Sequence, residues 1–297
     1  MTYDLSEKLD NFFGNADDLD DNVFVNDVKD HKYFDTSNLC NNFNQNTSFM
    51  LSINVCSLMS KHEKLMIFIN KLQAQNCNIL LIAIQETWNL QYPDLVDIPN
   101  FKFVFKTRSL SRGGGVAFYI LNNIQYKELI HLSYFEERVF ECLTVELTIN
   151  KKKCIVSNIY KSPNPANGSQ LEHNELFISY LDTHLYNLAQ CNCDVYVFTD
   201  SNLNLLNINN NNTTALYLET IYSNGFNQKV GKATRICNNN FSLIDHVFSK
   251  SSNLHFSTGT LLTDISDHMM NFIAFPDVKI VNNHQFCMKR DFSTPKI

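Results

Sequence analysis

Residues 79–88 read Ile-Leu-Leu-Ile-Ala-Ile-Gln-Glu-Thr-Trp (ILLIAIQETW), and this stretch decides the fold class. The first six residues are apolar without alternation, which is typical of a strand buried on both faces. Glu86 follows directly after that run. A carboxylate in such a place must be paired, hydrogen-bonded or bound to a metal, because an isolated buried charge is costly. The stretch therefore predicts a buried sheet with a polar group at its edge.

A strand and a helix precede this stretch. Residues 50–55 form a short apolar run with Asn54 near its end, which predicts a strand. Ser60 and Glu63 have the spacing of a capping box, ahead of apolar residues at helical spacing. We expect this helix to end around residues 75–78. The order strand, helix, strand, with a polar residue near the end of each strand, is the first indication of a functional edge.

The rest of the chain interleaves further strands with a few helices. Strands are expected over residues 101–105, 116–120, 139–149, 154–160, 195–198, 243–248 and 271–275. Helices are expected over residues 171–188 and 214–223, and Gly225 is a plausible C-cap of the second because glycine adopts a left-handed conformation freely. This pattern predicts two packed sheets with helices outside them.

Both ends of the chain differ in composition from its centre. Residues 1–48 are rich in Asp and Asn, and residues 15–21 (NADDLDD) carry the clustered negative charge typical of a solvated segment. We therefore expect an acidic lead-in with little structure over residues 1–48 and one domain over residues 49–276. Residues 277–297 are expected to form a tail or linker stub.

The bulk composition describes a globular protein with no general attraction to polyanions. The hydrophobic share is 44% and the aromatic share 12%, enough for a full core. No apolar run approaches the ~20 residues of a transmembrane helix, and the first residues lack the pattern of a secretory signal. We therefore expect an intracellular protein without a membrane partner. The formal net charge is −6, so a nucleic-acid substrate would need a local basic surface and metal ions.

The nine cysteines are odd in number and scattered along the chain. Cys191 and Cys193 are separated by one residue, which is not the spacing of a zinc knuckle. Others lie in apolar runs, where a free cysteine behaves as a small buried hydrophobe. We expect reduced thiols rather than a disulfide or zinc framework.

Polar residues recur at or inside the ends of the apolar runs. They are Asn54, Glu86, Asp200, Asn202, Asp245, Asp267 and His268. Any one of them is more often a surface residue than a ligand, but their recurrence indicates a shared site. Carboxylate and amide oxygens favour Mg²⁺, with Mn²⁺ as the alternative, over zinc. An acidic set with a histidine suits metal-assisted hydrolysis of a phosphate ester, in which an Asp–His pair handles a proton.

Seven short motifs, taken in their order, resemble one known superfamily. They are LSINVCSL (51–58), QETW (85–88), RGGGVAFYI (112–120), IYKSPN (159–164), TDSNLNLL (199–206), SLIDHVF (242–248) and SDH (266–268). This set resembles the endonuclease/exonuclease/phosphatase superfamily, and within it the apurinic-endonuclease-like domain of non-LTR, LINE-type retrotransposons. The resemblance covers about residues 49–276.

The resemblance implies a fold, an activity and a set of site residues. The fold would be an α/β four-layer sandwich of two mostly antiparallel sheets flanked by helices, as in DNase I. The activity would be metal-dependent nicking of DNA for target-primed retrotransposition. The metal ligands would be Glu86, Asn54 and Asp267. The catalytic residues would be Asp200, Asn202, His268, Asp245 and Tyr160.

Within that set, the resemblance assigns separate tasks. Asp200 and Asn202 would position or activate the nucleophilic water and hold the phosphate, with Tyr160 near the scissile phosphate. Asp245 would orient His268. His268 would then contact the phosphate or act as the base, and the sequence does not choose between it and Asp200 as the base.

Two places depart from the family pattern and keep alternatives open. Relatives usually have Gly-Asp-Phe-Asn where this chain has Thr199-Asp200-Ser201-Asn202, and Thr199 would shift Asp200 if its position needed a positive φ. Cys56 stands where some relatives place a second acidic residue. A catalytically decayed remnant or binding module is therefore one alternative. A phosphatase acting on a small or lipid phosphate is another.

Contacts to DNA are expected from basic residues near the motifs. Residues 102–112 (KFVFKTRSLSR) mix basic and aromatic side chains, which fits a surface that follows a nucleic-acid backbone, or equally an ordinary hairpin with a solvated face. Arg108, Arg112 and Lys161 are the expected substrate contacts. The expected partners are DNA and a reverse transcriptase domain of the same element. The resemblance also implies action in the nucleus.

Overall fold

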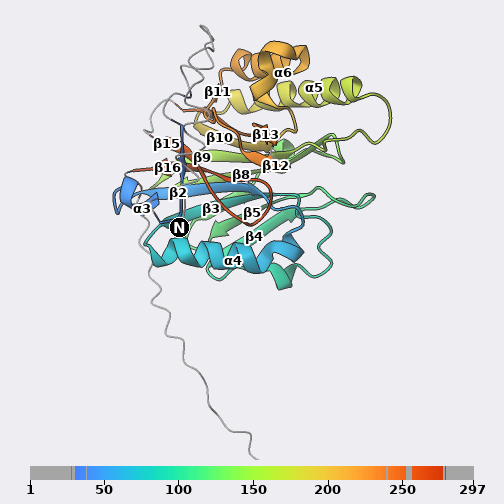
Figure 1. Ribbon diagram of the computed structural model, residues 1–297. Helices are drawn as coiled ribbons and strands as arrows, with labels where there is room; N and C mark the ends of the chain where they lie inside the picture. Colours follow the sequence, from blue (N-terminus) through green and yellow to red (C-terminus); the bar gives the residue numbers. More distant parts are fainter. Residues whose placement is uncertain are drawn as a thin grey trace, which may run out of the picture.

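Two seven-stranded sheets lie face to face, with helix α4 outside one sheet and helices α5 and α6 outside the other (Figure 1). This arrangement is the predicted α/β four-layer sandwich. In both sheets most neighbouring strands are antiparallel, as expected. The computed structural model describes residues 28, 31–37, 39–238, 240–251, 256–276 and 278.

The first sheet contains the stretch that decides the fold. Its strand order is β1-β15-β16-β2-β3-β5-β4. The strands are β1 (Lys32–Phe34), β2 (Ser48–Asn54), β3 (Asn78–Gln85), β4 (Phe101–Lys106), β5 (Val116–Leu121), β15 (Ser257–Leu261) and β16 (Met270–Phe275). Strand β3 is buried along nearly its whole length because α4 covers one side of this sheet and the second sheet covers the other (Figure 1). This double burial explains the unbroken apolar run of β3.

The second sheet is built around the parallel pair β9–β10. Its strand order is β11-β14-β10-β9-β8-β6, and β7 pairs with β8. The strands are β6 (Gln125–Glu128), β7 (Phe135–Glu136), β8 (Phe140–Ile149), β9 (Lys152–Tyr160), β10 (Asp194–Asp200), β11 (Asn227–Gln228) and β14 (Asp245–Lys250). Strands β12 (Arg235–Cys237) and β13 (Asn240–Ser242) form a separate hairpin, which the sequence did not predict.

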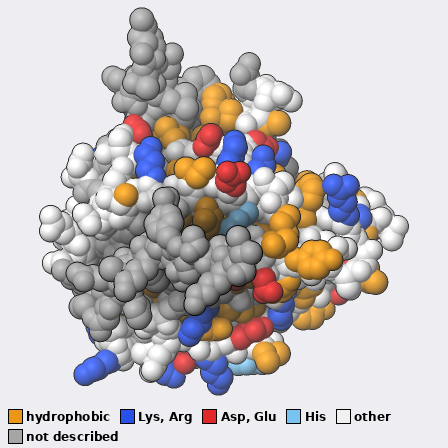
Figure 2. All heavy atoms as spheres, turned by 90° about the horizontal axis from the view of Figure 1, so that it is seen from below, with side chains coloured by type: hydrophobic (Ala, Val, Ile, Leu, Met, Phe, Trp, Pro, Cys, Tyr) orange, Lys and Arg blue, Asp and Glu red, His pale blue; other side chains and the backbone are white. Residues whose placement is uncertain are grey.

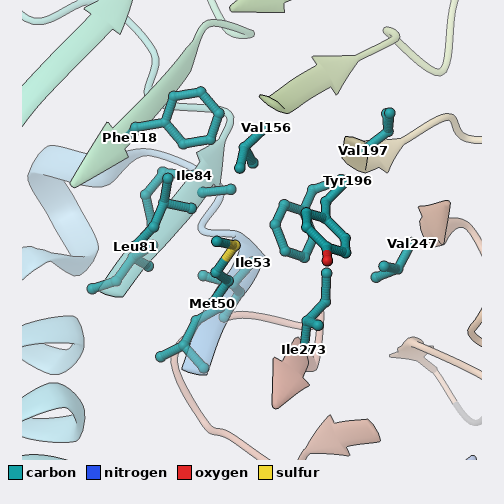
Figure 3. Close-up of a cluster of buried hydrophobic side chains, with 14 of the residues drawn as sticks. Met50, Ile53, Leu81, Ile84, Phe118, Val156, Tyr196, Val197, Val247 and Ile273 are labelled. Atoms are coloured by element: carbon teal, nitrogen blue, oxygen red, sulfur yellow. The ribbon is translucent and has the colours of Figure 1, made fainter. Parts of the chain in front are cut away.

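The core lies between the two sheets, which both contribute large apolar side chains to it (Figure 3). From the first sheet come Met50, Ile53, Leu81, Ile84, Phe118 and Ile273. From the second sheet come Val156, Tyr196, Val197 and Val247. Successive side chains of a strand point to opposite faces, so one set of these positions fills the space between the sheets and the other packs under the covering helices.

Helices α4, α5 and α6 lie close to where the sequence predicts, apart from the start of α4, whereas the short α3 was not predicted. They are α3 (Leu39–Asn42), α4 (Leu58–Ala74), α5 (Gln170–Ala189) and α6 (Asn212–Ser223), with short 3₁₀ turns η2 (Pro93–Val96), η3 (Ile130–Leu132) and η4 (Leu205–Asn210). The C-cap of α6 is Asn224, and Gly225, predicted as the C-cap, is the next residue, where its φ of 77° ends the helix in the left-handed conformation. No helix within the described residues is long and apolar enough to cross a membrane.

The exception at the start of α4 is the capping box expected at Ser60. Helix α4 begins earlier, at Leu58, with Ser57 as its N-cap, so Ser60 already lies in the first turn. A capping box does occur at the start of α5, where Ser169 and Glu172 each satisfy a backbone amide of the other. The serine spacing near α4 was therefore misleading.

Part of the expected lead-in is structured. Strand β1 extends the first sheet by pairing in parallel with β15, and Tyr33 and Leu39 are buried. Tyr33 OH also donates to Ala233 O at 2.9 Å. At the other end, Val278 is buried, and its carbonyl accepts a hydrogen bond from Ser48 Oγ. The remaining predictions for residues 1–48 and 277–297 lie outside the described residues.

The cysteines are not all reduced. Cys77 is disulfide-bonded, so the expectation of reduced thiols is wrong for this residue. Among the cysteines whose side chains the structure describes, the free ones are Cys56, Cys142, Cys154, Cys191, Cys193 and Cys237. Cys142 and Cys154 are buried among apolar side chains, as their sequence context predicts.

Candidate active site

The polar strand-end residues meet at one edge that the two sheets share. Strands β2 and β3 are parallel, so Asn54 and Glu86 reach the same end of the first sheet. Strands β9 and β10 are also parallel, which places Tyr160 beside Asp200. Antiparallel β14 then brings Asp245 opposite Asp200. The topology thus gathers these side chains in one place.

Asn54 joins the two sheets across this edge. Its Nδ2 donates to Glu86 Oε1 at 3.0 Å and to Asp200 Oδ2 at 2.7 Å. The Glu86 carboxylate accepts two more hydrogen bonds of 2.9 Å, from Tyr160 OH and from Trp88 Nε1. These neutral donors hold the Glu86 carboxylate in one orientation without offsetting its charge.

The Arg-Gly-Gly-Gly motif supports the loop that carries Glu86. Glu86 has φ 55°, in the left-handed region, and the next amide, Thr87 N, donates to Gly115 O at 3.4 Å. A Cβ on Gly115 would lie 2.3 Å from Thr87 Oγ1, so only glycine fits there. Gly115 N in turn donates to the buried Glu141 carboxylate at 2.6 Å. The glycines therefore position Glu86 through close backbone packing.

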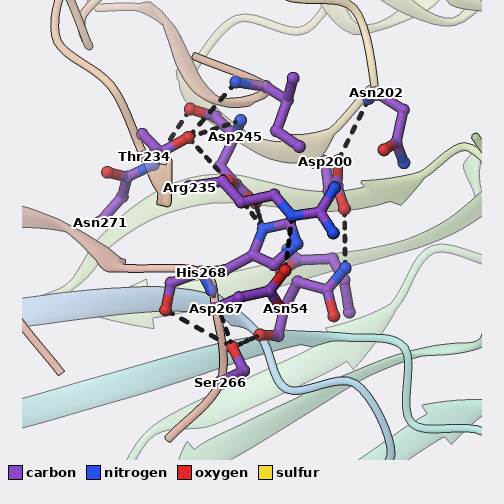
Figure 4. A network of polar contacts seen from close by, with 12 residues as sticks. Asn54, Asp200, Asn202, Thr234, Arg235, Asp245, Ser266, Asp267, His268 and Asn271 are labelled. Atoms are coloured by element: carbon purple, nitrogen blue, oxygen red, sulfur yellow. Dashed lines mark hydrogen bonds and ion pairs between the residues drawn. The ribbon is translucent and has the colours of Figure 1, made fainter. Parts of the chain in front are cut away.

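His268 and Asp245 form a hydrogen-bonded pair (Figure 4). His268 Nδ1 lies 2.9 Å and 3.0 Å from the two oxygens of Asp245, and Thr234 Oγ1 donates to Asp245 Oδ2 at 2.7 Å. Burial alone would lower the pKa of His268, but the charges of Asp245, Asp200 and Asp267 raise it to about 9. The imidazole is therefore protonated at neutral pH.

Asp200 is fully buried beside this pair. Burial, reinforced by the negative charge of Asp245, raises the pKa of Asp200 to about 7. Asn202 has φ 51°, and its backbone N–H donates to Asp200 Oδ1 at 3.1 Å. A carboxyl group that titrates near neutral pH can take up and release a proton during a reaction. This property favours Asp200 over His268 as the general base.

The site is completed by Arg235, which no motif includes, and by Cys56, which stands where some relatives place an acidic residue. Arg235 Nε donates to Asp267 Oδ2 at 2.7 Å, and Cys56 Sγ lies 3.6 Å from Asp267 Oδ1. Burial alone would raise the pKa of Asp267, but Arg235 and His268 hold it below its usual value. Arg235 reaches the site because its backbone pairs with that of His268. A lone basic residue outside the predicted strands was the only sequence signal for it.

Comparison with known proteins identifies the architecture. No protein-family model and no curated protein matches the chain. The AP endonuclease LMAP from Leishmania major matches with a TM-score of 0.61 at 14% identity, over 85% of this chain and 95% of that one. The endonuclease domain of TRAS1, a telomere-specific non-LTR retrotransposon, matches with a TM-score of 0.56 at 11% identity, over 78% and 99% of the two chains. An endonuclease/exonuclease/phosphatase family protein from Bacteroides thetaiotaomicron matches with a TM-score of 0.55 at 13% identity, over 77% and 97%.

The chain has the endonuclease/exonuclease/phosphatase fold. The superfamily predicted from the motifs is therefore confirmed at the level of the fold. At these identities the likeness does not extend to the substrate.

The endonuclease/exonuclease/phosphatase fold implies a divalent cation, and the donors at this edge fit one. Among the described residues, two groups have ligand atoms within 4.8 Å of one another: Asp200, Asp245 and His268, and Cys56, Asp267 and His268. Glu86 belongs to neither group, although its carboxylate faces the same edge. The first group could also transfer protons, because Asp245 forms a hydrogen bond with His268 Nδ1.

Asn54 is held by hydrogen bonds at both ends of its amide. Nδ2 donates to Glu86 and Asp200, and Oδ1 accepts from Cys56 N at 2.9 Å. Asn54 thus joins the two carboxylates, and its role as a metal ligand stays a prediction.

Arg108 and Lys161 are buried rather than placed for contact with substrate. Arg108 is 8% exposed, and its Nε pairs with Glu141 Oε1 at 2.5 Å. Lys161 is fully buried, and its Nζ donates to Ser162 O at 3.2 Å. Burial lowers the pKa of Lys161 to about 8. In this structure both side chains are internal anchors, and their contact with substrate stays a prediction.

Arg112 lies on the surface, and its contact with substrate stays a prediction. It is exposed, and its guanidinium carbon lies 5.1 Å from the centre of the Trp88 ring, an arrangement typical of a cation–π contact. Because Trp88 Nε1 donates to Glu86, this exposed positive charge stands next to the site.

The departures at Thr199 and Ser201 fit the fold without strain. Thr199 lies inside β10 and is not among the residues with positive φ, so the position does not require glycine. Ser201 is buried, and its Oγ accepts from Leu203 N at 3.1 Å and lies 3.4 Å from Ile244 O. The turn that exposes Asn202 is therefore stabilised by a hydroxyl group in place of an aromatic ring.

Proposed function

We propose that this protein is a divalent-metal-dependent endonuclease that nicks DNA for target-primed retrotransposition. The observation that carries the proposal is the network in which Asn54 joins Glu86 to Asp200 while Asp245 holds His268 beside them. The network combines a poised carboxyl group, a protonated imidazole and excess negative charge at one edge. Hydrolysis of a phosphodiester needs a base, a positive group for the phosphate and a cation.

The residues act on the phosphate as follows. Asp200 accepts the proton of the attacking water, because its pKa lies near neutral pH. His268, kept charged by Asp245, stabilises the negative charge that develops on the phosphoryl oxygens. Asn202 Nδ2 donates to Lys161 O at 2.8 Å, which orients its amide at the same turn.

A divalent cation, Mg²⁺ or Mn²⁺, would be held by the carboxylates of Glu86 and Asp267. When bound, it polarises the phosphoryl oxygen and neutralises developing charge. The charge of Glu86 is available for this because its hydrogen-bond partners are neutral.

DNA is proposed as the substrate on the basis of the surface and of the matched proteins. Arg112 and Trp88 present a positive charge and an aromatic ring beside Glu86. On the described part of the face in Figure 2, basic side chains are interspersed with acidic ones rather than gathered in a continuous basic area. Affinity must therefore come from contacts close to the site, as the net charge of −6 suggests. AP endonuclease and retrotransposon endonuclease are the names of two matched proteins.

The retrotransposon role carries two further proposals. The chain would act on nuclear DNA, and a reverse transcriptase domain of the same element would extend the nick. Both rest on the sequence resemblance.

A phosphatase is the second candidate, because the fold name itself covers that activity. A decayed remnant is disfavoured by the site, which keeps its carboxylates and His268 in mutual contact and tolerates Thr199 without strain.

The proposal is tested by nicking of supercoiled plasmid in Mg²⁺ or Mn²⁺, with EDTA and a Glu86→Ala variant as controls. Release of inorganic phosphate from a phosphomonoester is measured on the same preparation. We expect nicking that EDTA and Glu86→Ala both abolish, because loss of the carboxylate removes about 3 kcal/mol or more of transition-state stabilisation. Phosphate release without nicking would replace the endonuclease with the phosphatase, and neither activity from folded protein would support the remnant.

A further inference from the structure

Cys56 places a thiol among the acidic groups of the site. It follows β2 with φ 47°, half-buried, and its backbone N–H is fixed by Asn54 Oδ1 at 2.9 Å. The side chain points to Asp267, with Sγ 3.6 Å from Oδ1. The thiol therefore lies beside a carboxylate, where a cation would be attracted.

Cys56, Asp267 and His268 together present one sulfur, one oxygen and one nitrogen donor. Their ligand atoms lie within 4.8 Å of one another. Three protein ligands of these types, with a fourth position open, are typical of a catalytic or exchangeable zinc site. Magnesium, in contrast, takes oxygen ligands and has little affinity for sulfur.

The surrounding residues orient two of these ligands as metal sites require. Asp245 engages His268 Nδ1, which leaves Nε2 as the coordinating nitrogen. A carboxylate on the second nitrogen of a metal-binding histidine is the usual arrangement. Arg235 holds Asp267 Oδ2 at 2.7 Å, which leaves Oδ1 on the side of Cys56.

We propose that Cys56, Asp267 and His268 bind a thiophilic divalent cation of the zinc class. Binding releases the thiol proton of Cys56 and the imidazolium proton of His268 to solvent, and a metal–sulfur and a metal–nitrogen bond form. Occupancy removes the positive charge that His268 offers to the phosphate. The consequence for catalysis, which rests on the proposed function, is that zinc inhibits nicking supported by Mg²⁺ or Mn²⁺.

Binding is tested without substrate, on the full chain freed of metal. Co²⁺ is added as a spectroscopic probe, and sulfur-to-cobalt charge transfer is followed by its absorption, with Zn²⁺ as competitor. We expect one Co²⁺ per chain with a charge-transfer band that Zn²⁺ abolishes. Cys56→Ser should lose the band, whereas Cys237→Ser, which alters an exposed free thiol, should keep it. Asp245→Asn should weaken Zn²⁺ binding by about 10- to 100-fold.

A second measurement uses the unaltered protein and so does not depend on the folding of a variant. Alkylation of each cysteine is mapped by mass spectrometry with and without Zn²⁺. We expect Zn²⁺ to protect Cys56 and to leave Cys237 reactive. Absence of a charge-transfer band, or equal alkylation of Cys56 with and without Zn²⁺, would overturn the inference.

Nicking measured on the same preparation keeps this inference separate from the proposed function. Nicking in Mg²⁺ without zinc binding at Cys56 would leave the function standing and remove the zinc site. Zinc binding at Cys56 in a protein that nicks under no condition would do the reverse.

Discussion

Two buried clusters of this molecule each contain a histidine, and the two histidines behave in opposite ways. In the core, His184 Nε2 lies 2.8 Å from Ser157 Oγ and 3.6 Å from Cys142 Sγ. Burial lowers the pKa of His184 to about 4. At the sheet edge, His268 is equally buried, yet the charge of Asp245 and its acidic neighbours raises its pKa to about 9.

The pKa values of the two histidines differ because their partners differ in charge, and not because one side chain is more deeply buried. The core cluster pairs hydroxyl, thiol and neutral imidazole groups, so every contact is neutral and the cluster contributes to the fold. The edge cluster concentrates carboxylates beside one imidazolium. A buried side chain whose pKa is strongly shifted by neighbouring charges is typical of functional sites. The comparison predicts which substitutions alter catalysis and which alter stability alone.

The largest effect is expected from Glu86→Gln. The amide keeps the size of the side chain but lacks the charge for a cation. Its NH2 group must also face a donor, either Trp88 Nε1 or the pair Asn54 Nδ2 and Tyr160 OH. We expect plasmid nicking to fall by at least about 10²-fold, since a lost electrostatic contact costs that much or more. A thermal melt close to that of the wild type would show that the loss is not unfolding. Undiminished nicking would remove Glu86 from the mechanism.

Asp245→Asn should lower the pKa of His268 toward the low value of the core residue His184. In the wild type, the nicking rate should rise with pH as Asp200 loses its proton near pH 7, and fall above about pH 9 as His268 loses its own. Without the negative charge of Asp245 the pKa of His268 falls, so the alkaline limb should move to lower pH. Single-turnover rates across pH measure this shift. An alkaline limb at the same pH in both proteins would show that Asp245 does not hold the charge on His268.

Ser157→Ala should reduce stability and leave catalysis intact. The change removes the hydroxyl partner of His184 Nε2 at a fully buried position. An unpaired buried polar group costs about 1–3 kcal/mol, which urea unfolding would detect. Nicking per folded molecule should match the wild type, and a selective loss of activity would place the core cluster in the mechanism.

The smallest effect is expected from Thr199→Val. Thr199 Oγ1 is buried without a hydrogen-bond partner, so replacing the hydroxyl with a methyl group removes an unpaired polar atom from the core. Urea unfolding should show stability unchanged or raised by about 1 kcal/mol, with nicking unaltered. A clear loss of stability would mean that the hydroxyl is paired in solution.

Much of the fold could be predicted because its signals are local. The apolar run of β3, the helical spacing of α5 and the polar residues at the strand ends are each visible within a short stretch. Order along the chain then relates those stretches to a family. The parallel pairing of β2 and β3 then brings Asn54 and Glu86 to the same end of the sheet.

What escaped prediction depends on partners distant in sequence. Arg108 has the appearance of a surface residue until Glu141 pairs with it in the interior. Strand β1 is stable through its pairing with β15, almost at the other end of the chain. Arg235 enters the site only because its backbone lies beside His268. None of these pairings leaves a periodic pattern in the sequence.

Assignment of catalysis to the edge cluster is tested by single-turnover nicking of a labelled DNA duplex by Asp200→Asn and Ser157→Ala, compared at equal folded fraction in Mg²⁺. Asp200→Asn removes the proposed base at the edge, and Ser157→Ala alters the core cluster. We predict that Asp200→Asn nicks at least about 10²-fold more slowly than the wild type while Ser157→Ala nicks at the wild-type rate. Equal rates for the two variants would contradict the assignment of catalysis to the edge cluster.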